Sequence, residues 1–440
     1  MTTTALTYEK IDEAVLDTLS PPGRTYWTVV ALLFFGITVG AGCWIYQILT
    51  GIGVGGQNNP VHWGTYLINF VFWVGIAHSG TLISAILHLF RAGWRNPIAR
   101  AAETMTVFAV CTAGLFPFIH LGRVWMVYYM LPLPNQRFLW PNFMSPLIFD
   151  LVAISTYLTV SSLFWYTGML PDLAIIRDRA QGVRRKIFSI ISLGWTGEHE
   201  QWRHYARGYL FFAALATPLV ISVHSVVSWD FALGVVPGWH TTIFAPYFVA
   251  GAIHSGLAMV VTLMIPLRKI FHLEELITMR VLEQVAKTIV FTGLIVGFSY
   301  GTEVFIAWYS HNPIEVEAFR YRAFGDYALE YWIMVSCNSI IPLLLLFKKV
   351  RTRLSRLFVI CLLVNVGMWY ERFVIIVGSV AHDFLPYAWG LYRPSIIEYG
   401  IMVGSFCLFF FLFLLFVKHL PSVSMTEMKE TLHTGGAHGH

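Results

Sequence analysis

The chain has 440 residues, of which 57% are hydrophobic and only 12% are charged, and its formal net charge is +5. A soluble domain carries about a quarter charged residues, so this composition excludes an ordinary soluble enzyme and is typical of a polytopic membrane protein. The aromatic content of 16% agrees, because Trp and Tyr gather at membrane interfaces. No nucleic-acid partner is expected.

The chain begins with a predicted amphipathic helix. Residues 5–20 place Ile11, Val15 and Leu19 at roughly helical spacing, so the helix would lie on the membrane or on a partner subunit. We expect no cleavable signal peptide, because the first apolar run begins near Trp27 and no small-residue cleavage site follows it. Residues 1–25 are therefore interpreted as an N-terminal cytoplasmic segment.

Apolar runs of roughly 20 residues or more predict membrane-spanning helices. The expected fold is an all-α membrane protein with about ten transmembrane helices in a membrane domain over 26–420. The expected spans are 26–50, 64–90, 101–130, 146–170, 207–231, 241–267, 285–310, 327–347, 355–381 and 395–417. Residues 172–205 form the longest loop, which is basic and has a helical pattern of its own. Residues 421–440 are expected to be a polar, disordered cytoplasmic tail.

The distribution of Lys and Arg predicts the orientation. Most of the 29 basic residues lie in segments that share one side of the membrane when the ten spans alternate. The loops of the other side hold only Arg137, Arg320, Arg322 and Arg393. Basic residues favour the cytoplasmic side, so both termini are expected to be cytoplasmic.

A short internal repeat predicts how the helices are grouped. His78-Ser79-Gly80 recurs as His254-Ser255-Gly256, and the two copies are separated by four spans. Both copies therefore run in the same direction across the membrane, as parallel repeats do. The repeat predicts two four-helix bundles, about 62–231 (spans 2–5) and about 239–381 (spans 6–9), with spans 1 and 10 peripheral.

Four ionisable residues are predicted to share one depth, near the non-cytoplasmic ends of spans 3–5. These are His120, Arg123, Asp150 and Asp230. Ionisable groups in a span are costly and so indicate function by default. One interpretation is structural, with Arg123 paired to Asp150 or Asp230. The other is a proton-accepting site for a lipophilic redox molecule, because quinol oxidation needs two acceptors near the two quinol oxygens.

Further ionisable residues lie at other depths, and for each the alternative is a satisfied structural pair. His78, His254 and Glu303 are candidates for a proton pathway, since a relay needs protonatable groups at several depths. The remaining ones are Glu330, Glu371, Arg372 and Glu398. Glu371 and Arg372 are adjacent and should point in different directions around their helix, so each is expected to need its own partner.

No resident redox group or metal is expected. The five cysteines form no CxxC or CxxCH spacing, which argues against an iron–sulfur cluster or covalently attached haem. A bis-histidine haem needs facing histidine pairs, and spans 3–5 do not supply matching ones. The GGAHGH end is not expected to bind metal.

Three long motifs resemble the NrfD / polysulfide-reductase membrane-subunit family. They read GLFPFIHLGRVW (114–125), LPNQRFLWPNFMSPLIFD (133–150) and STYLTVSSLFWYTGMLPDLA (155–174). A fourth stretch, 222–256, resembles the same family. More narrowly, the motifs are similar to the ActC subunit of bacterial alternative complex III. The resemblance covers roughly residues 20–420, and the family fold agrees with the two bundles.

The resemblance implies quinol or menaquinol oxidation near the periplasmic face, with His120, Asp150 and Asp230 at the quinol site and Arg123 beside them. It implies three kinds of partner: subunits with c-type haem, an iron–sulfur subunit and a paralogous NrfD-like membrane subunit. Electrons would leave this chain for an iron–sulfur cluster on a partner.

Two other functions remain possible from the sequence. A structural or proton-conducting scaffold would lack its own quinol site. A secondary transporter is less favoured, because Pro117, Pro218 and Pro342 do not occupy matching positions in the two halves.

Overall fold

The fold was analysed in a computed structural model that describes residues 7–131, 146–239, 241 and 243–437. Arg137 and most of the 133–150 motif lie outside the described residues, as do the last three residues of the GGAHGH end. The elements are α1 (Tyr8–Thr18), α2 (Arg24–Thr50), η1 (Ile52–Val54), α3 (Thr65–Thr81), η2 (Leu82–Ile86), α4 (Leu87–Leu89), η3 (Gly93–Arg95), α5 (Asn96–Ala113), α6 (Leu115–His120), η4 (Val124–Met130), α7 (Pro146–Arg179), α8 (Gly182–Ile191), α9 (His199–Ala232), α10 (Phe244–Ile270), α11 (Met279–Ser310), α12 (Pro313–Phe324), α13 (Ala328–Val335), η5 (Ser336–Ile340), η6 (Ile341–Leu346), α14 (Lys348–Arg351), α15 (Leu354–Val380), η7 (Pro386–Ala388), α16 (Ile396–His419) and α17 (Met425–Ala437).

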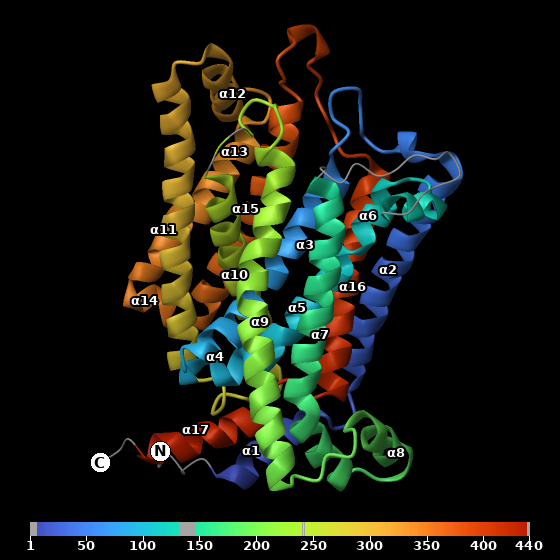
Figure 1. Ribbon diagram of the computed structural model, residues 1–440, viewed down its shortest axis with the longest axis vertical. Coiled ribbons are helices and arrows are strands. Elements are labelled where there is room, and N and C mark those ends of the chain that lie inside the picture. Colours follow the sequence, from blue (N-terminus) through green and yellow to red (C-terminus); the bar gives the residue numbers. More distant parts are fainter. Residues whose placement is uncertain (1–6, 132–145, 240, 242, 438–440) are drawn as a thin grey trace.

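The predicted all-α class and ten spans are confirmed. Within the described residues, ten helical stretches are long and apolar enough to cross a membrane, and none of these residues forms a strand. The stretches are α2, α3 to α4, η3 to α6, α7, α9, α10, α11, α13 to η6, α15 and α16. Figure 1 shows them running side by side, with α1, α8 and α17 at one end and α6 and α12 at the other. We call these the terminal end and the far end.

The third span ends earlier than the sequence predicted. A continuous helix was expected to residue 130, but α5 stops at Ala113 and the short α6 stops at His120. Pro117 has no N–H to bond the carbonyl four residues earlier, which interrupts the helix at this point. Gly122 then turns the chain with φ +66°, a backbone conformation that favours glycine. This break positions His120 at a helix end.

The two predicted bundles are visible in the packing. In the first, α3 packs on α5 and α9, and α7 packs on α5 and α9. In the second, α10 packs on α11 and α15, and α13 packs on α15. Contact between α3 and α10 joins the two bundles.

The repeated His-Ser-Gly motif lies at this contact. A Cβ added to Gly256 would meet the side chain of Ser79 and lie 2.6 Å from the carbonyl oxygen of Ile76. Gly75 faces Ser255 in the reverse sense, with a would-be Cβ 3.6 Å from its hydroxyl. The small residues of the two copies therefore let the bundles approach closely, as small residues do between membrane helices.

The first and last spans were predicted to be peripheral, and the structure adds that they pack on each other. α2 packs along α16, which in turn contacts α5 and α3. Glycines four residues apart line both sides of this contact, Gly36 and Gly40 on one helix and Gly400 and Gly404 on the other. A Cβ on Gly40 would lie 2.7 Å from the Cα of Gly404, so no larger residue fits without moving the helices.

The chain ends pack on each other at the terminal end. The apolar face of α1 is covered by this chain itself, with Ile11 and Val15 fully buried. Lys429 of α17 pairs with Asp12 of α1 at 2.7 Å. The tail expected to be disordered instead forms α17, because its Met425 and Met428 side chains are buried against the bundle. The predicted helical pattern within 172–205 is α8, between extended ends of α7 and α9.

Candidate functional site

Two buried aspartates meet at the far end of the first bundle. Asp150 lies in the first turns of α7 and Asp230 in the last turn of α9, and these helices pack together. The residues are 5% and 7% exposed, and their carboxyl groups are near enough to influence each other electrostatically. Both oxygens of Asp230 and Oδ1 of Asp150 lack hydrogen-bond partners among the described groups. Two carboxylates this close repel, so the pair can accept and share a proton.

His120 lies at the same end but not in the same described contact. It is half-buried at the last residue of α6, its Nδ1 is buried without a hydrogen bond to any described group, and its electrostatic neighbour is His62. No described interaction joins it to Asp150 or Asp230. The imidazole is therefore free to accept a proton or a hydrogen bond from a ligand.

The predicted ion pair of Arg123 with Asp150 or Asp230 is not formed. Arg123 follows the turn at Gly122 and its side chain is exposed. The aspartates face each other instead. The expectation failed because it assumed a continuous third span, which would have kept Arg123 on the same helix face as His120.

The end of α6 is held by a polar contact from the first span. Gln47 of α2 donates from Nε2 to the carbonyl oxygen of Ile119 at 2.9 Å, and Tyr66 of α3 donates to the Oε1 of Gln47. Gln47 and Tyr66 are fully buried. These two residues therefore fix the backbone next to His120 and so position its side chain.

A histidine pair lies deeper in the first bundle. The rings of His78 (α3) and His224 (α9) are 4.5 Å apart between centroids, and both residues are fully buried. Tyr157 of α7 stacks on His78 at 5.2 Å and exchanges a 2.7 Å hydrogen bond with Thr81. Neither nitrogen of His224 is hydrogen-bonded to a described group. Tyr157 is two helical turns, about 10 Å, below Asp150 on the same face of α7.

Glu371 and Arg372 do not have the separate partners that we expected. Arg372 Nη1 pairs with Oε1 of Glu371, although the two are adjacent on α15. Tyr300 donates to the other carboxylate oxygen, and Asn338 donates to Tyr300 at 2.9 Å. The long arginine side chain folds back along the helix and lies over the ring of Phe248 at 5.0 Å. The pair closes a buried polar cluster inside the second bundle.

The other two predicted relay residues lie in the second bundle. Nδ1 of His254 contacts the Thr292 hydroxyl at 2.9 Å, and its Nε2 has no described partner. Glu303 is 6% exposed, with Oε1 unpartnered among the described groups, and it borders a small cavity with Arg322. No described hydrogen bond connects His78, His254 and Glu303 directly.

Glu398 has a structural role. It closes a capping box with Ser395 at the start of α16 and accepts a 2.7 Å hydrogen bond from Tyr392.

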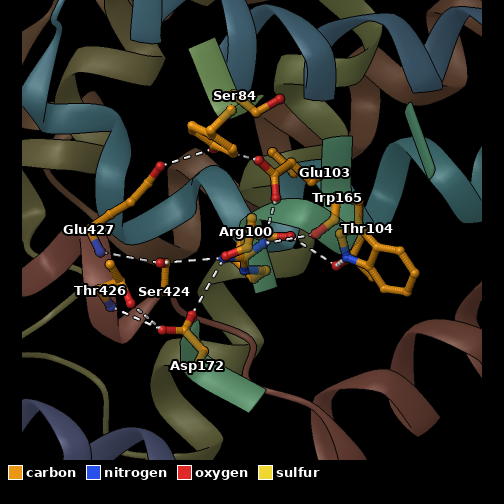
Figure 2. A network of polar contacts seen from close by, with 12 residues as sticks. Ser84, Arg100, Glu103, Thr104, Trp165, Asp172, Ser424, Thr426 and Glu427 are labelled. Carbon is orange, nitrogen blue, oxygen red and sulfur yellow. Dashed lines mark hydrogen bonds and ion pairs between the residues drawn. The ribbon is translucent and has the colours of Figure 1, made fainter. Parts of the chain in front are cut away.

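A second polar network lies at the terminal end (Figure 2). Arg100 of α5 donates to Glu103 at 2.9 Å and Asp172 at 3.4 Å. Glu427 of α17 accepts from Arg95 at 2.8 Å and from Tyr209 at 3.0 Å. Burial raises the pKa of Glu427, but Arg95 and Arg100 outweigh burial and hold that pKa below its ordinary value. The network joins the C-terminal helix to the first bundle.

The sequence analysis missed His224, Tyr157, Gln47 and Tyr66 in this region. His224 lies in the 222–256 stretch, six residues before Asp230, and a single histidine in an apolar span does not indicate which residue it faces. The uncharged partners carried no signal, since buried Gln and Tyr are recognised only by what they contact.

The family model described as "Polysulphide reductase, NrfD" matches residues 53–382. A protein of Halobacterium salinarum, named as a putative membrane subunit of dimethyl sulfoxide reductase, is 29% identical over 255 residues, which are 57% of this chain and 53% of that protein. The matched part of the chain thus spans about half the length of this relative.

Proposed function

Because the chain belongs to the polysulphide reductase NrfD family, we propose that it is the quinol-oxidising membrane subunit of a respiratory or photosynthetic quinol:acceptor oxidoreductase, of the alternative complex III type. The observation that carries this proposal is the buried Asp150–Asp230 pair at the far end of the first bundle, unneutralised by any described cation. Burying two carboxyl groups in a membrane costs free energy, so such a pair indicates a functional role.

Oxidation of a quinol to a quinone releases two electrons and two protons. In the proposed site, the Asp150–Asp230 pair takes one proton and the free Nδ1 of His120 is available for the other. Both acceptors lie at the far end, where the Lys and Arg distribution supports a non-cytoplasmic location. Arg123, exposed beside the turn at Gly122, would meet the substrate or a partner subunit rather than the aspartates.

The electrons must leave the chain. We propose that they pass to an iron–sulfur cluster on a partner subunit at the far end, and then to c-type haem. A paralogous NrfD-like subunit would complete the membrane part of the complex. Menaquinol is the proposed substrate, and the bacterial inner membrane is the proposed location, with both termini cytoplasmic.

A proton route through the two bundles is a further part of the proposal. His78, His254 and Glu303 each keep a ring nitrogen or carboxylate oxygen without a described partner, as a relay group must. The His78–His224 contact and Tyr157 support a first step from the Asp150 region.

The test is quinol oxidation by the purified complex with Asp150→Asn, Asp230→Asn and His120→Gln. Loss of a general base lowers turnover by roughly 10²–10⁴-fold, so each variant should fall in this range with all subunits present. Glu317→Gln, an exposed acid at the same end, is the matched control and should keep full activity. Near-normal turnover in both aspartate variants would sink the proposal.

A scaffold or proton-conducting subunit without its own quinol site is the second candidate. It is favoured by one observation: no described contact joins His120 to the aspartate pair. A photoreactive quinone distinguishes the two. Labelling of α7 or α9 supports the quinol site, whereas labelling of another subunit alone, with active aspartate variants, supports the scaffold.

A further inference from the structure

The structure contains a cavity of about 760 Å³ whose lining includes neither the aspartate pair nor the histidine pair. It is bordered by α3, α10, α13, α15 and α16, on the side of the second bundle. Its volume is in the range of about 300–1,000 Å³ that small-molecule sites occupy.

The cavity is polar at one end and apolar along its length. Asp326, Glu330 and Arg393 lie at the far-end mouth, where α13 and α16 begin. Phe406 and Phe410 line the deeper part of α16. Phe410 is 14 residues into α16, so the cavity reaches roughly 20 Å from the helix start. One leaflet of a bilayer, headgroup included, has about the same depth.

Several polar groups that line the cavity have no partner among the residues that the structure describes. Oε2 of Glu330 is buried without a described hydrogen bond. Asn365, only 6% exposed, donates weakly to Thr262 at 3.3 Å but leaves its Oδ1 unpartnered. Arg393 is exposed at the mouth and forms no ion pair with any described residue. Buried polar atoms cost free energy unless a ligand or water satisfies them.

The charges at the mouth select the ligand. A guanidinium binds phosphate with paired hydrogen bonds, and carboxylates bind an ammonium group. A quinone head is neutral and would leave Arg393 without a counter-charge. An anionic headgroup would meet Asp326 and Glu330 unfavourably. A headgroup with one phosphate and one ammonium satisfies all three side chains.

We propose that this cavity binds one zwitterionic phospholipid with a primary amine headgroup, from the leaflet at the far end. Its phosphate lies on Arg393, its ammonium group contacts Glu330 and Asp326, and one acyl chain fills the cavity along Phe406 and Phe410. The lipid would stabilise the junction of α13, α15 and α16. This site is independent of the proposed quinol chemistry.

The test is native mass spectrometry of the delipidated full-length chain titrated with phosphatidylethanolamine, phosphatidylglycerol and menaquinone. Phosphatidylethanolamine should bind with a stoichiometry of one. Arg393→Gln and Glu330→Gln should each weaken this binding by about tenfold or more, since each removes a charge-assisted contact. Val366→Trp should abolish it by filling the cavity.

Two controls separate this site from general lipid contact. Arg320→Gln removes an exposed far-end charge outside the cavity, and Val403→Trp adds the same bulk to α16 outside the lining. Both should bind as the parent does. If Val366→Trp does not fold, the two charge variants decide.

Equal binding by the parent and the charge variants would overturn the proposal, as would equal affinity for phosphatidylglycerol. Menaquinone that competes with the lipid and is lost in Val366→Trp would also overturn it and identify a second quinone site.

Discussion

Replacing Glu427 by Gln tests whether the C-terminal helix holds the first bundle together (Figure 2). The substitution keeps the size of the side chain but removes its charge. Arg100 would still have Glu103 and Asp172. Arg95, whose side chain is 4% exposed, would keep only neutral acceptors, the Ser84 carbonyl and His88.

The expected loss follows from leaving Arg95 buried and unpaired. Breaking a buried ion pair costs about 3–5 kcal/mol, so the free energy of unfolding of the detergent-solubilised chain should fall by about this amount. Replacing both partners by apolar residues, Arg95→Met with Glu427→Leu, removes the uncompensated charge and should be less destabilising than either single change. Glu274→Gln, an exposed acid at the terminal end, is the control.

The pH dependence of the free energy of unfolding provides a second test. The pKa of Glu427 is lower in the folded chain than its ordinary value of 4.5, so the stabilisation is present above that pH and is lost as the pH falls through the folded pKa. The stability difference between parent and Glu427→Gln should therefore be constant near neutrality and shrink on acidification. A single variant within about 0.5 kcal/mol of the parent, or a double variant as unstable as the summed singles, would refute the reasoning.

Three further changes have defined outcomes. Gly404→Leu crowds the α2–α16 contact and should lower stability by about 1–3 kcal/mol in thermal unfolding, whereas Gly42→Leu, which faces open space, should not; equal effects would contradict the close approach. Gln47→Leu leaves two buried polar groups without their partner and should cost about 1–3 kcal/mol, with a change in the NMR signal of His120 that a remote effect would not produce. Arg372→Gln leaves a buried carboxylate unpaired and should cost about 3–5 kcal/mol; unchanged denaturant midpoints would exclude a stabilising pair.

Much of the fold followed from the sequence, because membrane helices obey simple constraints of length and charge. Each span must be roughly 20 apolar residues, and the His-Ser-Gly repeat marked the contact between the bundles. The predictions were wrong where helix formation does not depend on apolar length alone. Pro117 and Gly122 end the third span early. The polar tail forms α17 because Met425 and Met428 are buried against the bundle and Glu427 pairs with Arg95.

The candidate site was predicted less completely. Charge at a membrane depth identified Asp150 and Asp230, since a buried carboxylate is conspicuous in an apolar sequence. Which groups face each other depends on helix rotation and on breaks such as that before His120, and spacing alone does not give these. Adjacent residues point in different directions around a helix, but the long side chain of Arg372 folds back and pairs with Glu371 all the same.

The glycine contact between α2 and α16 also sets an order of events during synthesis. The two glycine faces are separated by almost the whole chain, so at about 5–20 residues per second α2 waits roughly 20–70 s before α16 is made. Throughout that time the glycine face of α2 has no partner helix and can pair with another glycine-lined helix in the membrane. Synthesis of α16 covers this face. A chain truncated before α16 would therefore expose it and would tend to associate with other membrane helices.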